Sequence, residues 1–192
     1  MNPEASSKDP LSEDVREVVV TAEEIRRVVS EIGASISRDY AGRRPVLVGA
    51  LKGVLYFLSD LVRAITIPVE LDLIAISNYS AAARERGLVR LVKDLDTSIA
   101  GRHVIFVEDV VDTGLTLGYI LRNLRLRQPA SLEVCALFNK PRHRLIDIRF
   151  KYKGIDLPDL LVVGYGLDYR EKYRYLPYVA SLKPEIFGAS KK

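Results

Sequence analysis

The chain has 192 residues, 48% of them hydrophobic, with a formal net charge of +4 and Cys135 as its one cysteine. This length suits one domain of ordinary size, which we place at residues 15–187 between tails at 1–14 and 188–192 that lack apolar periodicity. A single cysteine excludes a disulfide framework, and the sequence offers neither an uninterrupted membrane span nor the apolar core of a signal peptide, so we expect a cytoplasmic protein.

Short apolar runs alternate with segments of helical periodicity along the chain. In chain order the first predicted elements are a strand at 18–20 and a helix capped by Thr21 and Glu24, with apolar residues from Ile25 to Ile36. A strand at 46–50, a helix at 54–62 and a strand at 69–76 follow, and then a polar segment at 77–87 and a strand at 88–92. The last predicted elements are a strand at 104–107, a helix after Gly114, and strands at 132–138 and 160–163. This alternation predicts an α/β domain with a mainly parallel sheet flanked by helices. Ligands of such sheets bind outside the carboxyl ends of the strands.

The segment from Val104 to Thr116 carries the strongest functional pattern, because an apolar run ends in Glu108 and Asp109 and then turns through Asp112-Thr113-Gly114 into a helix. Such a turn exposes unpaired backbone N–H groups at the positive end of the helix dipole, where phosphate binds well. The two acids at the strand end can accept hydrogen bonds from vicinal ribose hydroxyls or anchor a hydrated cation. Asp112 stays close to the sugar, where a carboxylate can act as a general base or stabilise positive charge.

A Walker B strand end is the alternative interpretation, but the sequence lacks the G-x-x-x-x-G-K-[ST] loop that it requires. Residues Glu108 to Thr116 instead resemble the phosphoribosyl diphosphate motif of the type I phosphoribosyltransferases. Further segments narrow the resemblance to the hypoxanthine-guanine phosphoribosyltransferases: Leu51-Lys52-Gly53 resembles their diphosphate-binding loop, Leu95 between Asp94 and Asp96 resembles their Lys-Asp-Leu segment, and Pro158-Asp159 through Tyr169 resembles their purine-binding end. The resemblance extends from about Val18 to Leu182.

The resemblance implies the type I phosphoribosyltransferase fold, with a small hood region and a mobile loop. It implies Mg²⁺-dependent transfer of the phosphoribosyl group from 5-phosphoribosyl 1-diphosphate to hypoxanthine or guanine, which yields IMP or GMP in purine salvage. It also implies a homodimer or homotetramer and makes a nucleic-acid partner unexpected. Relatives can have a non-proline cis peptide in the diphosphate loop, which here would join Leu51 and Lys52.

The family's functional residues can be carried over to the matching positions of this sequence. They are Glu108, Asp109, Asp112, Thr113, Gly114, Leu115 and Thr116 for the ribose phosphate, with Asp112 as the catalytic residue; Lys52, Gly53 and Arg174 for diphosphate; Lys140, Leu161, Val162 and Asp168 for the purine; Glu108, Asp109 and Asp168 for Mg²⁺; and Tyr79 in the lid.

Lys140 is expected to donate to the exocyclic oxygen at purine position 6, so adenine, which has an amino donor there, would be rejected. Two positions depart from the family pattern. Leu161 occupies the stacking position where relatives commonly have an aromatic residue, which gives up about 0.5–1.5 kcal/mol and predicts weaker base affinity. Asn78 precedes Tyr79 where relatives have serine. His143 is expected to face solvent or to pack, without a role in the site.

Two alternatives remain open at this point. The chain can be a xanthine-preferring or hypoxanthine-only enzyme, because the backbone geometry that excludes a 2-substituent is not visible in the sequence. It can also be a nucleic-acid-binding regulator on the same fold, which would use the basic residues Arg122, Arg125, Arg127, Arg142 and Arg144. Such arginines are more often a solvated face.

Overall fold

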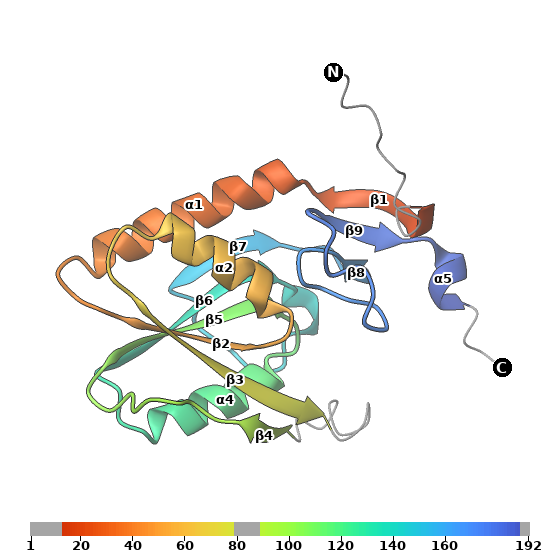
Figure 1. Ribbon diagram of the computed structural model, residues 1–192. Helices are drawn as coiled ribbons and strands as arrows, with labels where there is room; N and C mark the ends of the chain where they lie inside the picture. The colour runs from red at the N-terminus through yellow and green to blue at the C-terminus, as the bar shows by residue number, and fades with distance from the viewer. Residues whose placement is uncertain (1–12, 79–88, 189–192) are drawn as a thin grey trace.

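The structure, a computed structural model, describes residues 13–78 and 89–188 and contains a six-stranded and a three-stranded sheet (Figure 1). The larger sheet has the order β4-β3-β2-β5-β6-β7, in which β4 is an antiparallel edge strand and the other five are parallel. Its strands are β2 (Val46–Leu51), β3 (Glu70–Asn78), β4 (Val89–Lys93), β5 (His103–Val111), β6 (Ser131–Asn139) and β7 (Tyr152–Asp156). The mainly parallel α/β fold predicted from the sequence is confirmed.

Helices cover both faces of this sheet. Helices α1 (Ala22–Asp39) and α2 (Val54–Ala64) lie on one face and α4 (Leu115–Arg125) lies on the other (Figure 1). Neighbouring strand residues point to opposite faces, so Ile105 joins the core beneath α1 and α2 while Phe106 joins the core beneath α4. The predicted cap of α1 is present, because the Thr21 side chain accepts a hydrogen bond of 3.2 Å from the Glu24 N–H.

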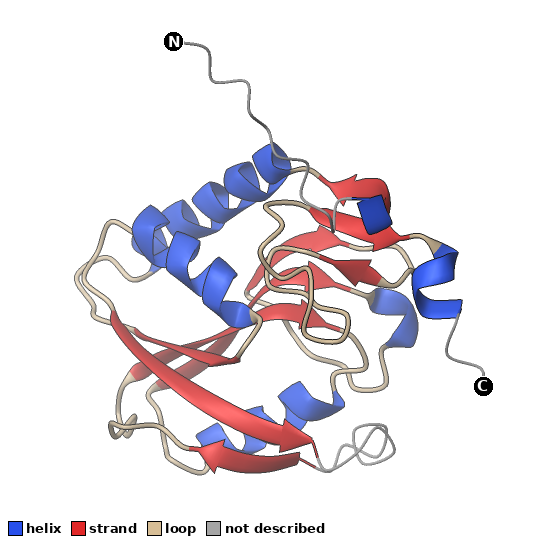
Figure 2. Ribbon diagram, turned by 45° about the vertical axis from the view of Figure 1, so that its right-hand side comes forward, coloured by secondary structure: helices blue, strands red, loops and turns tan. Residues whose placement is uncertain are grey.

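The smaller sheet is formed by both ends of the described chain. Strand β9 (Val179–Leu182) pairs on one side with β1 (Val15–Val20) and on the other with β8 (Val162–Val163), both antiparallel. The short helix α5 (Pro184–Gly188) follows β9 (Figure 2). This sheet has a small core of its own that includes Val163 and Leu182, and it is the hood region that the resemblance implied.

Several predicted strand boundaries were wrong, and two strands were not predicted. Strand β5 continues past 104–107 to Val111 because its backbone keeps pairing with β6, and Glu108 lies opposite Ala136. The strand predicted at 160–163 shortens to β8. Strands β7 and β9 were not predicted, since neither Tyr152–Asp156 nor Val179–Leu182 has a long apolar run. Most of the polar segment at 77–87, including the predicted lid residue Tyr79, lies outside the described residues.

Candidate active site

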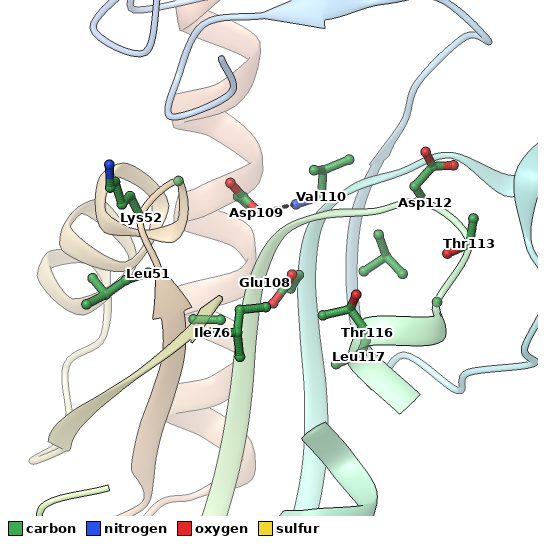
Figure 3. Close-up of a pocket in the computed structure, with 14 residues that line it drawn as sticks. Leu51, Lys52, Ile76, Glu108, Asp109, Val110, Asp112, Thr113, Thr116 and Leu117 are labelled. Carbon is green, nitrogen blue, oxygen red and sulfur yellow. Dashed lines mark hydrogen bonds between the residues drawn. The ribbon is translucent and has the colours of Figure 1, made fainter. Parts of the chain in front are cut away.

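A cavity of about 490 Å³ opens at the carboxyl ends of β2 and β5, between the two strands where the chain order of the sheet reverses (Figure 3). Ligands of open α/β sheets bind at such a point. Lys52 lies on one side of the cavity and Asp112 and Thr113 lie on the other. Of the predicted residues, those that line it are Lys52, Gly53, Glu108, Asp109, Asp112, Thr113, Gly114 and Thr116.

Two carboxylates come from the end of β5. Burial, and then the neighbouring Asp109, raise the pKa of Glu108 well above its ordinary value. Burial also raises the pKa of Asp109 to about 6, against the lowering effects of a hydrogen bond from the Val110 N–H and of the Arg174 guanidinium. The Val110 N–H lies 2.7 Å from Asp109 Oδ1. Glu108 Oε2 is buried without a hydrogen-bond partner among the described residues, so this oxygen can accept a hydrogen bond from a ligand or bind a cation.

These carboxylates fit a hydrated magnesium ion. No cluster of three or more metal-ligating side chains exists in the described part of the chain. Mg²⁺ in phosphate-transfer sites is typically bound by one or two carboxylates together with water and substrate phosphate oxygens. The unpartnered oxygen of Glu108 and the buried carboxylate of Asp109 match that donor set.

The turn from β5 into α4 has the geometry of an anion-binding site. Gly114 at its N-terminus has a φ of +82°, and a side chain there would lie 2.9 Å from Ile148 Cδ1, so this position suits glycine alone. Leu115 is the first helical residue, and its N–H lies 3.4 Å from Thr113 Oγ1. The amides of this first turn have no partners within the helix, which leaves them free to donate to phosphate.

The loop after β2 forms the opposite wall. The peptide bond between Leu51 and Lys52 is cis, as the resemblance implied. A side chain at Gly53 would overlap Asp109 Oδ2, and a side chain at Gly166 would overlap the Gly53 carbonyl oxygen. Glycine at both positions therefore lets the β2 loop, the acidic strand end and the hood approach one another closely. Lys52 Nζ lies 3.2 Å from Glu171 of the hood.

Arg174 and Asp168 of the hood form an ion pair of 2.7 Å, and Arg174 Nη1 donates to the Gly166 carbonyl oxygen at 2.7 Å. The two side chains do not line the cavity, but both influence the pKa of Asp109 and are therefore close to the acidic strand end. Arg174 Nη2 also lies 3.4 Å from Glu171, but its buried Nε has no hydrogen-bond partner among the described residues, so the guanidinium keeps a donor available for an anion.

The residues predicted to bind the purine lie outside the lining of the cavity. Lys140 follows β6, its N–H bonds the Val111 carbonyl oxygen at 2.9 Å, and its ammonium donates to the Leu160 carbonyl oxygen at 2.8 Å. Leu161 has 40% of its surface exposed, whereas Val162 is buried in β8. The lysine is therefore tethered beside an exposed aliphatic side chain, next to the strand end that bears Asp112.

Sequence reasoning missed two side chains of the site. His143 was expected to face solvent or to pack, but its ring lies 3.1 Å from Asp112 and 3.0 Å from Asp159. Glu171 was not among the predicted site residues. The hydrogen bond from Lys52 and the charge of Arg174 lower the pKa of its carboxyl. Both residues contact side chains that are distant in the sequence, and a local sequence pattern does not predict such contacts.

Comparisons with known proteins agree with this geometry. The model of the phosphoribosyl transferase domain family matches residues 18–170. A hypoxanthine-guanine phosphoribosyltransferase of Streptococcus agalactiae is 45% identical over 93% of this chain and 99% of its own length, and that of Bacillus subtilis is 40% identical over 92% and 98%. The crystal structure of a hypoxanthine phosphoribosyltransferase from Staphylococcus aureus superimposes with a TM-score of 0.90 at 42% identity, over 94% of this chain and 98% of that one. This chain thus belongs to the hypoxanthine-guanine phosphoribosyltransferase family.

Proposed function

We propose that this chain transfers the phosphoribosyl group of 5-phosphoribosyl 1-diphosphate to N9 of hypoxanthine or guanine, giving IMP or GMP and diphosphate. The observation that carries this proposal is a single cavity lined by the N-terminus of α4, by the carboxylates of Glu108 and Asp109, and by Lys52. Relatives named hypoxanthine-guanine phosphoribosyltransferases support the choice of base. The reaction is one of purine salvage.

In this proposal the sugar-phosphate half of the substrate lies along β5 and the turn that follows it. The 5′-phosphate accepts hydrogen bonds from the backbone amides of residues 113–116 and from the hydroxyls of Thr113 and Thr116. Glu108 and Asp109 accept from the ribose hydroxyls. The unpartnered Oε2 of Glu108 supports the assignment, because a buried oxygen without a donor gains from a hydroxyl that the sugar brings.

The diphosphate lies between the β2 loop and the hood. Lys52 Nζ, the amide of Gly53 and the guanidinium of Arg174 donate to it, which requires Glu171 to share or release the two cations that it now contacts. Glu108, Asp109 and Asp168 are the residues that would hold Mg²⁺. When bound, the metal neutralises charge on the diphosphate and makes it a better leaving group.

The reaction exchanges one bond at C1′ for another. The N9 lone pair of the purine forms the new bond as the C1′–O bond breaks and its electron pair leaves with diphosphate. Positive charge develops on the ribose ring, and the carboxylates at the end of β5 oppose it. The proton on N7 passes to Asp112, whose exposed carboxylate lies at the purine side of the cavity.

Lys140 selects the base in this proposal. Its ammonium, held at the Leu160 carbonyl, can donate to a 6-oxo group but offers no acceptor to the 6-amino group of adenine. The exposed side chain of Leu161 covers one face of the ring, and Val162 stays in the hood core. Tyr79 is proposed to close over the site, although it lies outside the described residues.

We also propose that the enzyme is a homodimer or homotetramer. One face of α2 exposes Leu55 and Tyr56 beside a second cavity of about 360 Å³, an apolar surface that a further copy of the chain can cover. A cytoplasmic location is consistent with the one cysteine, which is buried and free. No described helix has the length and apolar character needed to cross a membrane.

A spectrophotometric assay tests the proposed function. The protein is mixed with Mg²⁺, 5-phosphoribosyl 1-diphosphate and, in parallel, hypoxanthine, guanine, xanthine or adenine. We expect turnover of hypoxanthine and guanine and none of adenine, with loss of activity on chelation of the metal. A strong preference for xanthine, or for hypoxanthine over guanine, would correct the substrate, and inactivity with all four bases would refute the enzyme.

A further inference from the structure

His143 lies between two carboxylates that come from different parts of the chain. Its Nδ1 is 3.1 Å from Asp112 Oδ1, and its Nε2 is 3.0 Å from Asp159 Oδ1. Asp112 follows β5, His143 ends the short 3-10 helix Pro141–His143 after β6, and Asp159 precedes β8 of the hood. All three side chains are roughly half exposed, so the trio lies at the rim of the site.

The Nδ1 contact with Asp112 has the geometry of a hydrogen bond, and the Nε2 contact with Asp159 lies within ion-pair distance. A neutral imidazole has one donor nitrogen and one acceptor nitrogen, whereas an ionised carboxylate only accepts. The ring can donate to both carboxylates at once only if the trio holds one proton more than a neutral imidazole with two ionised carboxylates. In the form with a charged ring, both nitrogens donate, and the ring links the two acids.

The backbone around Asp112 is already fixed by the same segment. Arg144 Nε donates to the Asp112 carbonyl oxygen at 2.9 Å, and its Nη2 donates to the Val111 carbonyl oxygen at 3.2 Å. The Leu145 N–H bonds the Thr113 carbonyl oxygen at 2.9 Å. With the main chain held, the remaining freedom of Asp112 is rotation of its carboxylate, and His143 is the side chain that restrains it.

We propose that His143 is a positioning residue for phosphoribosyl transfer: hydrogen-bonded to Asp112 and within ion-pair distance of Asp159, it holds the Asp112 carboxylate toward the purine and ties it to the hood. The inference rests on the proposed function, in which Asp112 accepts the N7 proton. A carboxylate that rotates freely is seldom aligned with N7, and a misplacement of about 1 Å can lower a rate by about a hundredfold.

A histidine in this role makes positioning dependent on pH. Imidazole changes its charge between about pH 5 and 8, whereas a guanidinium stays charged and can also donate to two carboxylates. Two carboxylates, Asp112 and Asp159, contact the ring. The nearby cations are Arg144, which donates to the Asp112 carbonyl oxygen, Lys140, which donates to the Leu160 carbonyl oxygen, and Arg142, which precedes His143 in the 3-10 helix. A neutral ring has one donor nitrogen, so it can donate to only one of the two carboxylates.

Three variants test the proposal. His143→Phe keeps a ring of similar size without either nitrogen, His143→Arg keeps two donors at every pH, and Arg142→Ala removes a neighbouring exposed cation without touching Asp112. We measure kcat and KM for both substrates from about pH 5.5 to 8.5, together with thermal unfolding of each variant.

We expect His143→Phe to lower kcat by about tenfold or more while KM for 5-phosphoribosyl 1-diphosphate changes little, and His143→Arg to restore kcat. The ratio of wild-type kcat to that of His143→Arg should fall as pH rises, and Arg142→Ala should behave as wild type. Full kcat in His143→Phe, or a ratio that is flat with pH, overturns the role of His143 while the proposed function stands. A wild-type protein that turns over no 6-oxopurine overturns the proposed function itself.

Discussion

Replacing Asp109 by asparagine removes a carboxylate that the fold holds at an energetic cost. The side chain lies at the end of β5, and burial raises its pKa from 3.8 to about 6. An acid with a higher pKa in the folded state keeps its proton when the unfolded chain has lost it. The contribution of Asp109 to stability is therefore most favourable below about pH 4 and falls as pH rises to about 6, above which this contribution is lost.

The size of this loss follows from the pKa change. At about 1.4 kcal/mol for each tenfold change in proton affinity, a rise from 3.8 to about 6 corresponds to about 3 kcal/mol. Asparagine keeps the oxygen that accepts the bond from the Val110 N–H but cannot ionise. We expect Asp109→Asn to gain about 3 kcal/mol in free energy of unfolding relative to wild type between pH 4 and pH 8.

Urea unfolding at pH 4 and pH 8, with the metal chelated, measures this difference. Asp147→Asn is the matched control, because it removes an exposed carboxylate and should show no such change. At pH 8 the same Asp109→Asn variant should have a higher KM for 5-phosphoribosyl 1-diphosphate with Mg²⁺, since the oxygen that binds the sugar or metal has lost its charge. An unfolding difference equal at both pH values would refute the idea that a buried, costly charge is kept for the substrate.

Further substitutions test the purine side. Asp112→Asn should lower kcat by about a hundredfold or more with little change in either KM, because the amide cannot take the N7 proton; an unchanged kcat would remove Asp112 from that role. Lys140→Ala should lower kcat/KM for hypoxanthine and reduce its preference over adenine, and preserved selectivity would assign base choice elsewhere. Leu161→Phe should lower KM for hypoxanthine about two- to tenfold through stacking on the base, and no improvement would count against Leu161 as the platform.

The part of the cavity proposed to bind the sugar phosphate could be located from the sequence because its residues are contiguous. The local sequence, an apolar run followed by two acids and a Thr-Gly turn, predicts a strand end that leads into a helix. In the structure this strand end and helix N-terminus line one cavity. The alternation of strands and helices likewise follows from periodicity along the chain.

The remainder depends on contacts between distant segments. The approach of Gly53 to Asp109 and Gly166 joins three distant segments, and the ring of His143 meets Asp112 after β5 and Asp159 before β8. Strand β7 is held by pairing with β6 rather than by an apolar pattern of its own, so its sequence of Tyr, Lys, Gly, Ile and Asp did not predict it. Pairing of this kind is decided by the whole fold and is not encoded locally.

The hood has a consequence for the order in which the protein is made. Strand β1 is synthesised first and its partner β9 near the end, and the parallel sheet lies between them in the sequence. A ribosome-bound chain that has reached β6 already contains β2, β5 and the turn for the sugar phosphate, yet it still lacks Asp168 and Arg174. While it grows, such a chain holds its acidic strand end without the cation that accompanies it in the finished protein. Completion of the hood therefore sets the moment at which newly made enzyme can begin to work.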